Sequence, residues 1–288
     1  MALSFKKIST LALLLGSGSV MAGTMGAAHV PAQTNFFVGL GGSYNSIQTK
    51  QNVYAIGVAS YTGSISGSGT AQGPAYPFYN TENTFAPEVQ AGFFRQIMDT
   101  NYLWGVKFSY QYLGAVATHS TFTVSQSGTV NGTVLNGNVL IESAQNKTTH
   151  EMLLLPFIGQ SFKHSQVYLG VGPALFGTGS NINGEIGFAN LFSSPTDLTG
   201  APANSSKKSW EWGGAAQVGL SYFLASDWTV DLSYTYAISN QYKVNYAIPF
   251  THFVKADNIT TTGTGYTNTS QNVMAQAVTL TVNKVFSM

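Results

Sequence analysis

The sequence predicts an all-β fold, an antiparallel up-and-down transmembrane β-barrel of eight strands. Only 8% of its 288 residues are charged and 44% are hydrophobic, whereas soluble domains contain about 25% charged residues. Several segments alternate apolar and polar side chains with a period of two, as strands with two different faces do. Short and long links between these segments also alternate strictly, which is typical of membrane barrels.

The N-terminus predicts export. It reads "MALSFKKISTLALLLGSGSVMA", with Lys6 and Lys7 before a short apolar run and small residues at Val20 and Ala22. This is the pattern of a cleaved secretory signal peptide. We therefore expect residues 1–22 to be removed after Ala22 and residues 23–288 to form the barrel domain.

Charge and cysteine content exclude several classes of protein. Removal of the signal peptide takes Lys plus Arg from 12 to 10, against 11 Asp plus Glu, so no basic patch for nucleic acid is expected. The chain has no cysteine, which excludes a disulfide framework. After the N-terminal region no apolar run of about 18 residues occurs, so spanning strands are expected rather than spanning helices.

Three strands are predicted in the first part of the chain, over residues 34–46, 84–97 and 102–114. Apolar and polar side chains alternate in the core of each strand. The apolar faces of the first two carry Phe36, Val38, Leu40 and Tyr44, and Val89, Ala91 and Phe93. The apolar face of the third carries Trp104, Val106, Phe108, Tyr110 and Tyr112.

Five further strands follow. Residues 148–162 contain "MLLLPFI", which is apolar on both faces, so no face is assigned there. Residues 166–177 alternate again, with Tyr168 on the polar side. Residues 213–239 supply two strands joined at "ASDW", and residues 272–288 supply the last. Each segment has at least the roughly 9–11 residues that a tilted strand needs to cross a bilayer.

The links predict the topology. Three are about four residues long, at 98–101, 163–166 and 225–228. Four are about 30 residues or longer and rich in Gly, Ser, Thr and Asn: 47–83, 115–147, 178–207 and 241–270. We expect short periplasmic turns on one side of the membrane and four long, polar, mobile extracellular loops on the other.

The second long link contains Asn131-Gly132 and Asn136-Gly137. Asn-Gly pairs among β-branched residues predict a hairpin above the membrane. If this hairpin crossed the membrane, the barrel would have ten or twelve strands. Eight is preferred because the segment lacks the aromatic ends of the other strands.

The apolar face is expected to contact lipid and the polar face to line the lumen. Aromatic side chains near strand ends are typical of interfacial girdles, although an aromatic soluble core is the alternative interpretation. The predicted girdle consists of Trp104, Tyr110, Tyr112, Trp210, Trp212, Tyr222, Trp228, Tyr234 and Tyr236.

Three stretches, "FFVGLGGSYN", "GGAAQVGLSYFLASDWTVDLSYTY" and a last strand ending at Phe286, resemble outer-membrane β-barrels of the OmpA/opacity-protein type. "AGTMG" at residues 22–26 also resembles the mature start of some major outer-membrane proteins of intracellular gammaproteobacteria. The resemblance implies a bacterial outer-membrane location, with outer-membrane lipid, lipopolysaccharide and the barrel-assembly machinery as partners. It also implies that Phe286 is the assembly signal. Ser287 and Met288 follow it, and Met288, which lies in the same alternation register, is the alternative.

The inward-facing charges are the candidate functional residues: Glu88, Lys107, Glu211 and Asp231, with Glu151 as a further candidate. Charges in a narrow lumen need partners. One interpretation is a network that plugs the barrel, since an eight-stranded barrel is just wide enough for side chains to fill. The other is a narrow pore whose selectivity these charges set. The sequence does not assign the acid that pairs with Lys107.

No enzyme signature is present. The five histidines have no metal-ligand spacing, the Gly-rich segments lie outside any strand–turn–helix unit, and no catalytic triad is apparent. We therefore expect no catalytic activity, metal or cofactor. The favoured function is a structural and surface-display protein, adhesin- or opacity-like, whose long loops contact a host-surface ligand. A small porin is the alternative, and a lipid-modifying enzyme is the third hypothesis.

Overall fold

The structure is a computed structural model that describes residues 34–191 and 194–287; the predicted signal peptide and Met288 lie outside the described residues. Among the described residues no helix is long and apolar enough to cross a membrane. The described elements are β1 (Thr34–Gly63), β2 (Gly67–Gln72), β3 (Tyr76–Gln96), β4 (Tyr102–His119), β5 (Phe122–Val130), β6 (Thr133–Ile141), β7 (Ser143–Ser161), β8 (Ser165–Leu191), β9 (Ser194–Asp197), β10 (Ala203–Ala225), β11 (Trp228–Ser239), β12 (Tyr242–Val254) and β13 (Ile259–Ser287).

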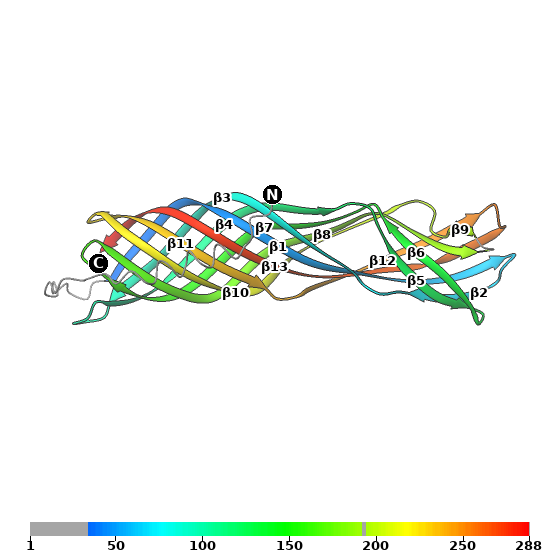
Figure 1. Cartoon of the computed structure of the whole chain (residues 1–288), viewed down its shortest axis with the longest axis horizontal. Coiled ribbons are helices and arrows are strands. Elements are labelled where there is room, and N and C mark those ends of the chain that lie inside the picture. Colours follow the sequence, from blue (N-terminus) through cyan, green and yellow to red (C-terminus); the bar gives the residue numbers. More distant parts are fainter. Residues whose placement is uncertain (1–33, 192–193, 288) are drawn as a thin grey trace. The chain divides into compact units, whose positions relative to one another are not determined.

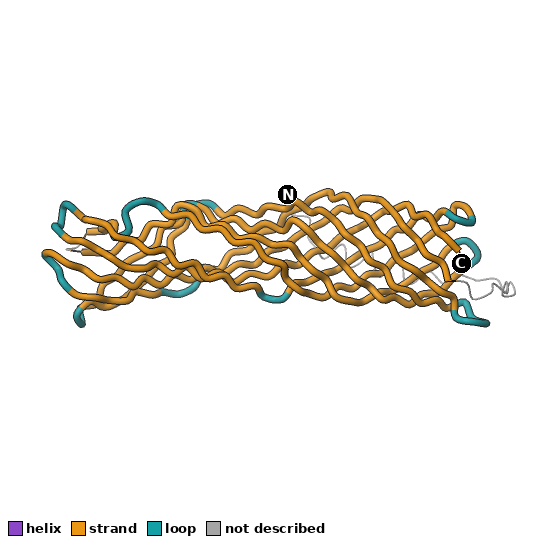
Figure 2. Tube along the Cα trace, turned by 180° about the vertical axis from the view of Figure 1, so that it is seen from behind, coloured by secondary structure: helices purple, strands orange, loops and turns teal. Residues whose placement is uncertain are grey.

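Eight of these strands close into a hydrogen-bonded ring. The order is β1-β3-β4-β7-β8-β10-β11-β13, and β13 pairs with β1 again. All of these pairings are antiparallel, and Figure 2 shows the strands winding obliquely around the ring. The predicted eight-stranded up-and-down ring is therefore confirmed. The hairpin β5–β6 lies outside it, so the alternative of ten or twelve ring strands is wrong.

The three short links are turns, as predicted. They join β3 to β4, β7 to β8 and β10 to β11. The first turn is bonded to β7, because the Ser161 backbone N–H donates to Asn101 O at 2.7 Å. The Phe223 N–H donates to His164 O and the Val285 N–H to Asp227 O, both at 2.8 Å. The three turns therefore lie at one end of the ring, here called the turn end.

The four long links are not loops, and this prediction is wrong. β1 and β13 stay paired from Asn35↔Ser287 to Gly63↔Ile259, far beyond the predicted end of the first strand at Ser46. The other links also consist mainly of strand, including β2, β5, β6, β9 and β12. Their Ser, Thr and Asn content is typical of loops, but each backbone finds a neighbouring strand to bond.

These additional strands continue the same sheet beyond the ring, in a part here called the extension. Its order is β12-β13-β1-β2-β5-β6-β8-β9, and Figure 1 shows it continuing from the ring. Asn131 and Gly132, with φ of 49° and 83°, close the β5–β6 hairpin as predicted, since a two-residue turn of this type needs positive φ at both positions. Asn136-Gly137 lies inside β6 and forms no turn.

The outer face of β13 changes from apolar in the ring to mainly polar in the extension. On the outer face of β13, the ring carries Val278, Leu280 and Val282, each about half exposed, whereas the extension carries Asn272 and Ser270. The interior of the extension holds apolar clusters instead. An apolar exterior suits an apolar solvent and a polar exterior suits water. The outer face of β13 therefore suits an apolar solvent along the ring and water along the extension.

We expect Leu280→Arg to destabilise the barrel in lipid by about 2–4 kcal/mol, the cost of a basic side chain near the middle of an apolar band. Leu280 faces the neighbouring Leu232, midway between the aromatic residues Trp228 and Tyr236 of β11. Asn272→Arg, on the same face of the same strand but in the extension, is the matched control and should cost less than about 1 kcal/mol.

The measurement is folding into lipid vesicles as a function of urea concentration, with the folded fraction read from the heat-dependent gel shift. Equal losses for the two variants would contradict the assignment of the ring exterior to lipid.

Candidate functional site

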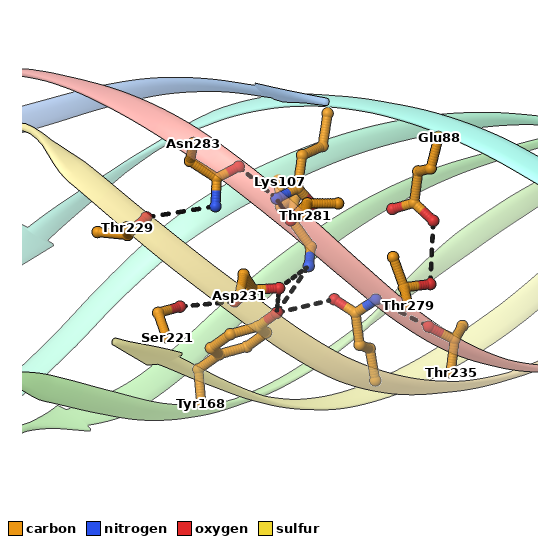
Figure 3. A network of polar contacts seen from close by, with 12 residues as sticks. Glu88, Lys107, Tyr168, Ser221, Thr229, Asp231, Thr235, Thr279, Thr281 and Asn283 are labelled. Atoms are coloured by element: carbon orange, nitrogen blue, oxygen red, sulfur yellow. Dashed lines mark hydrogen bonds and ion pairs between the residues drawn. The ribbon is translucent and has the colours of Figure 1, made fainter. Parts of the chain in front are cut away.

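The centre of the ring holds a polar network around Lys107. This lysine is 3% exposed, and its ammonium donates to the Tyr168 hydroxyl at 2.8 Å. The Tyr168 hydroxyl in turn donates to Asp231 Oδ1 at 2.9 Å, and Lys107 Nζ lies 3.9 Å from the same oxygen (Figure 3). The ammonium also lies 4.8 Å from the centroid of the Tyr168 ring. Three strands of the ring, β4, β8 and β11, are joined through these three side chains.

Asp231 has a second partner, and the network extends through amides. Ser221 Oγ donates to Asp231 Oδ2 at 2.6 Å, so both carboxylate oxygens are bonded. Gln217 Oε1 lies 3.4 Å from the Tyr168 hydroxyl oxygen, and Gln217 Nε2 donates to Thr235 at 2.8 Å. A buried carboxylate that is paired and bonded at both oxygens carries a much smaller desolvation penalty than a free one.

A second set of polar contacts joins β3 to β13 over the intervening strand β1. Gln90 donates to Thr281 Oγ1 and to Asn283 Oδ1, both at 2.6 Å. Thr279 Oγ1 donates to Glu88 Oε2 at 3.0 Å, so Glu88 faces the same interior as Lys107. Both strands present these side chains because inward positions alternate with outward ones.

The structure places the predicted charges in two regions. Glu88, Lys107 and Asp231 lie in the network, whereas Glu211 is half-buried and accepts a hydrogen bond from Ser209 at 2.6 Å, outside it. Glu151 is 1% exposed, and neither of its carboxylate oxygens has a hydrogen-bond partner.

Sequence reasoning did not include Tyr168 among the candidates. The available signal was its position, because it is the aromatic residue on the polar face of its strand. Its phenol is the group that connects the lysine to the aspartate.

Apolar layers lie beside the network within the ring. At the turn end, buried side chains of Phe37, Phe94 and Phe157 pack with Tyr168 itself. Farther from the turns a second buried cluster includes Leu155 and Phe176. The cavity beside the network has a volume of about 20 Å³, which is room for about one water molecule. The interior is filled by side chains, as the width of an eight-stranded barrel allows.

The unassigned segment of β7 now has two faces. Leu153, Leu155 and Phe157 are buried, whereas Leu154 and Ile158 are exposed. Both faces are apolar because one packs in the interior layers and the other forms part of the ring exterior.

The predicted girdle residues all lie on the outer face of the ring, in two groups. Trp104 and Trp228 lie near the turn end, with Tyr222. Tyr112 and Tyr236 are each eight positions farther along the same strands as Trp104 and Trp228, which is about 26 Å along a strand and about 20 Å of height at a typical tilt. The second group consists of Tyr110, Tyr112, Trp210, Trp212, Tyr234 and Tyr236.

A histidine joins part of the second aromatic group. His150 Nδ1 lies 2.9 Å from the Tyr110 hydroxyl, and its ring stacks on Trp210 at a centroid distance of 5.5 Å. At the turn end Phe286 is 49% exposed on the outer face, opposite Phe36 of β1. The described residues contain no group of three or more side chains able to hold a metal ion.

The comparisons with known proteins give structural likeness without a sequence family. No family model matches the chain, and no curated protein matches it. Solved structures of small outer-membrane β-barrels are similar to it. The outer-membrane protein OprG from Pseudomonas aeruginosa has 11% identity and a TM-score of 0.37, and the match covers 88% of this chain and 97% of OprG.

Two further structures are similar over most of the chain. The outer-membrane protease OmpT from Escherichia coli has 13% identity and a TM-score of 0.32, with 92% of this chain and all of OmpT covered. Neisserial surface protein A has 12% identity and a TM-score of 0.27, and the match covers 84% of this chain and 96% of that protein. What bears on function is the arrangement of this chain's own side chains.

We expect Lys107→Met to destabilise the ring by about 3–5 kcal/mol, because it leaves the Asp231 carboxylate buried without its counter-charge. Adding Asp231→Asn should recover at least half of that loss, since both charges are then absent. The measurement is urea unfolding in lipid vesicles, with the two single variants and the double variant compared. Additive losses in the double variant would mean that Lys107 and Asp231 are not energetically coupled.

Proposed function

We propose that this protein is a bacterial outer-membrane β-barrel with a closed lumen, whose role is structural and in surface display through the extension. The observation that carries the proposal is the change of outer-face polarity from ring to extension. The ring has an apolar exterior and a bonded polar network inside, whereas the outer face of β13 in the extension is mainly polar.

The ring exterior supports the membrane location. Large apolar side chains, among them Leu, Val, Phe and Trp, are exposed on all eight ring strands, and soluble monomers rarely expose a large contiguous apolar surface. Aromatic groups bound this surface at heights about 20 Å apart, close to the roughly 25 Å apolar band of outer-membrane barrels. Ring closure also leaves no unpaired strand edge in the lipid.

The filled lumen favours a structural role over transport. The Lys107 network and two apolar layers occupy the interior, and about 20 Å³ remains beside the network. An ion or solute would have to displace buried, bonded side chains to pass. The same burial favours a non-enzymatic role, because the charged groups of the network bond one another rather than facing a substrate.

The exterior of the chain beyond the second aromatic group supports lipopolysaccharide as a partner. Lysines from four strands are outward-facing there: Lys50, Lys147, Lys208 and Lys243. Basic side chains just outside the apolar band are placed to meet anionic lipid headgroups. Folding through the barrel-assembly machinery, with Phe286 as the assembly signal, and contact of the extension with a host-surface ligand remain part of this proposal.

The first test is single-channel conductance of the refolded chain in a planar bilayer, with folding verified by the heat-dependent gel shift. We expect no stable openings from the wild type. Lys50→Ala, which changes an outer lysine, is the control for Lys107→Ala. Reproducible openings in the wild type that change with Lys107→Ala but not with Lys50→Ala would replace the structural role with transport.

The second test concerns the lipid partner. The double variant Lys50→Ala/Lys208→Ala should bind lipopolysaccharide at least about tenfold more weakly, because each basic side chain near an anionic surface contributes about 1 kcal/mol. The measurement is binding of fluorescent lipopolysaccharide to the barrel in nanodiscs of uncharged lipid. Lys163→Ala at the turn end is the control and should have no effect; an equal effect of both would contradict a specific contact.

A further inference from the structure

The extension contains a partly open cavity of about 350 Å³, a size within the range of small-molecule sites. The walls come from β1, β2, β5, β6, β8, β12 and β13, and most of the lining side chains are apolar. Tyr61, Val130 and Leu198 are examples, each less than 9% exposed. The lining residue of β13 is Gly265, thirteen positions from the half-exposed Val278 of the ring exterior.

Two buried polar side chains line this apolar cavity. Glu185 is 7% exposed; its Oε1 accepts a hydrogen bond from Thr267 Oγ1 at 2.6 Å, and its Oε2 has no partner. Gln126 is 9% exposed and its Nε2 has no partner. Burial raises the pKa of Glu185, and the Thr267 hydrogen bond opposes this.

An unpartnered buried polar atom costs about 1–3 kcal/mol. Two such atoms in one apolar cavity therefore favour a ligand that supplies their missing partners. Leucine at either position would avoid the cost if the cavity only had to be filled.

One wall differs from the others. Among the described residues β9 pairs with β8 and β12 pairs with β13, and no pairing joins β9 to β12. The segment 198–203 lies along the cavity at this position. It is held by Asp197 Oδ1, which accepts from the backbone N–H groups of Thr199 and Gly200, and by Thr261, which donates to Leu198 O at 2.5 Å. The segment is also bonded to β8, because the Leu198 N–H donates to Gly187 O and the Gly187 N–H donates to Thr199 Oγ1, both at 2.9 Å.

We propose that this cavity binds a small, uncharged apolar molecule that carries a hydroxyl group, such as a phenol or a medium-chain alcohol. A hydroxyl donates to Glu185 Oε2 and accepts from Gln126 Nε2, so it suits either group. A hydrocarbon leaves both Glu185 Oε2 and Gln126 Nε2 without a partner. A protonated amine has no lone pair to accept from Gln126 Nε2. An anion is repelled by the Glu185 carboxylate. The apolar lining accounts for the body of the ligand.

The experiment compares 1-naphthol with naphthalene, which has the same rings and no hydroxyl, on the full folded barrel in nanodiscs. We expect one 1-naphthol to bind per chain, at least tenfold more tightly than naphthalene. Glu185→Leu should weaken 1-naphthol binding at least tenfold and leave naphthalene binding unchanged, whereas Glu185→Gln, which keeps an acceptor oxygen, should retain it. Glu142→Leu changes a glutamate outside the cavity lining and should have no effect.

Ala189→Phe places a ring into the cavity and should abolish binding of both probes, which separates the site from partition into lipid. Equal affinity of both probes for the wild type would overturn the proposal, as would 1-naphthol binding that survives Ala189→Phe. Failure of 1-naphthol to bind the wild type would overturn it as well. Each variant is first verified by the heat-dependent gel shift, so loss of folding is not mistaken for loss of the site.

Discussion

The pairing of the first strand with the last is the interaction on which the rest of the structure depends. β1 and β13 are hydrogen-bonded from Asn35↔Ser287 to Gly63↔Ile259, and this pairing turns an eight-stranded sheet into a ring. In an apolar solvent every backbone N–H and C=O must be satisfied within the protein. An open sheet would leave two edges unpaired, so closure is what allows the exterior of the ring to be apolar.

Closure also fixes the width of the interior, and the width explains the Lys107 network. In a ring of eight strands, inward side chains from opposite walls meet, and no bulk water separates them. A charge there needs a partner within reach, which Lys107 finds in Asp231 through Tyr168. Glu151 is the exception, because both of its oxygens are buried without a hydrogen-bond partner.

The extension follows from the same strands continuing past the apolar band. Once β13 leaves the ring, its outer face becomes mainly polar, whereas β1 still exposes Val58. The inner faces of the extension pack into apolar clusters. β2, β5, β6, β9 and β12 add to these strands and cover the apolar face. The added strands do not close into a second ring among the described residues, because no pairing joins β9 to β12. The segment 198–203, which follows β9, lines the cavity around Glu185.

The sequence by itself determined the ring strands, the three short turns and the inward or outward direction of most ring side chains. These features are local, because a period of two and a turn signal can be read within a dozen residues. It also placed the Asn131-Gly132 turn, since that pair directly sets the backbone conformation of a tight hairpin.

Only the tertiary structure decided what meets across the ring. The partner of Lys107, the separation of Glu211 from the network and the two faces of residues 152–158 depend on strands far apart in the chain. The long links were misread for the same reason. A polar, Gly-rich composition is typical of loops. These segments form strands because neighbouring strands supply their backbone hydrogen bonds.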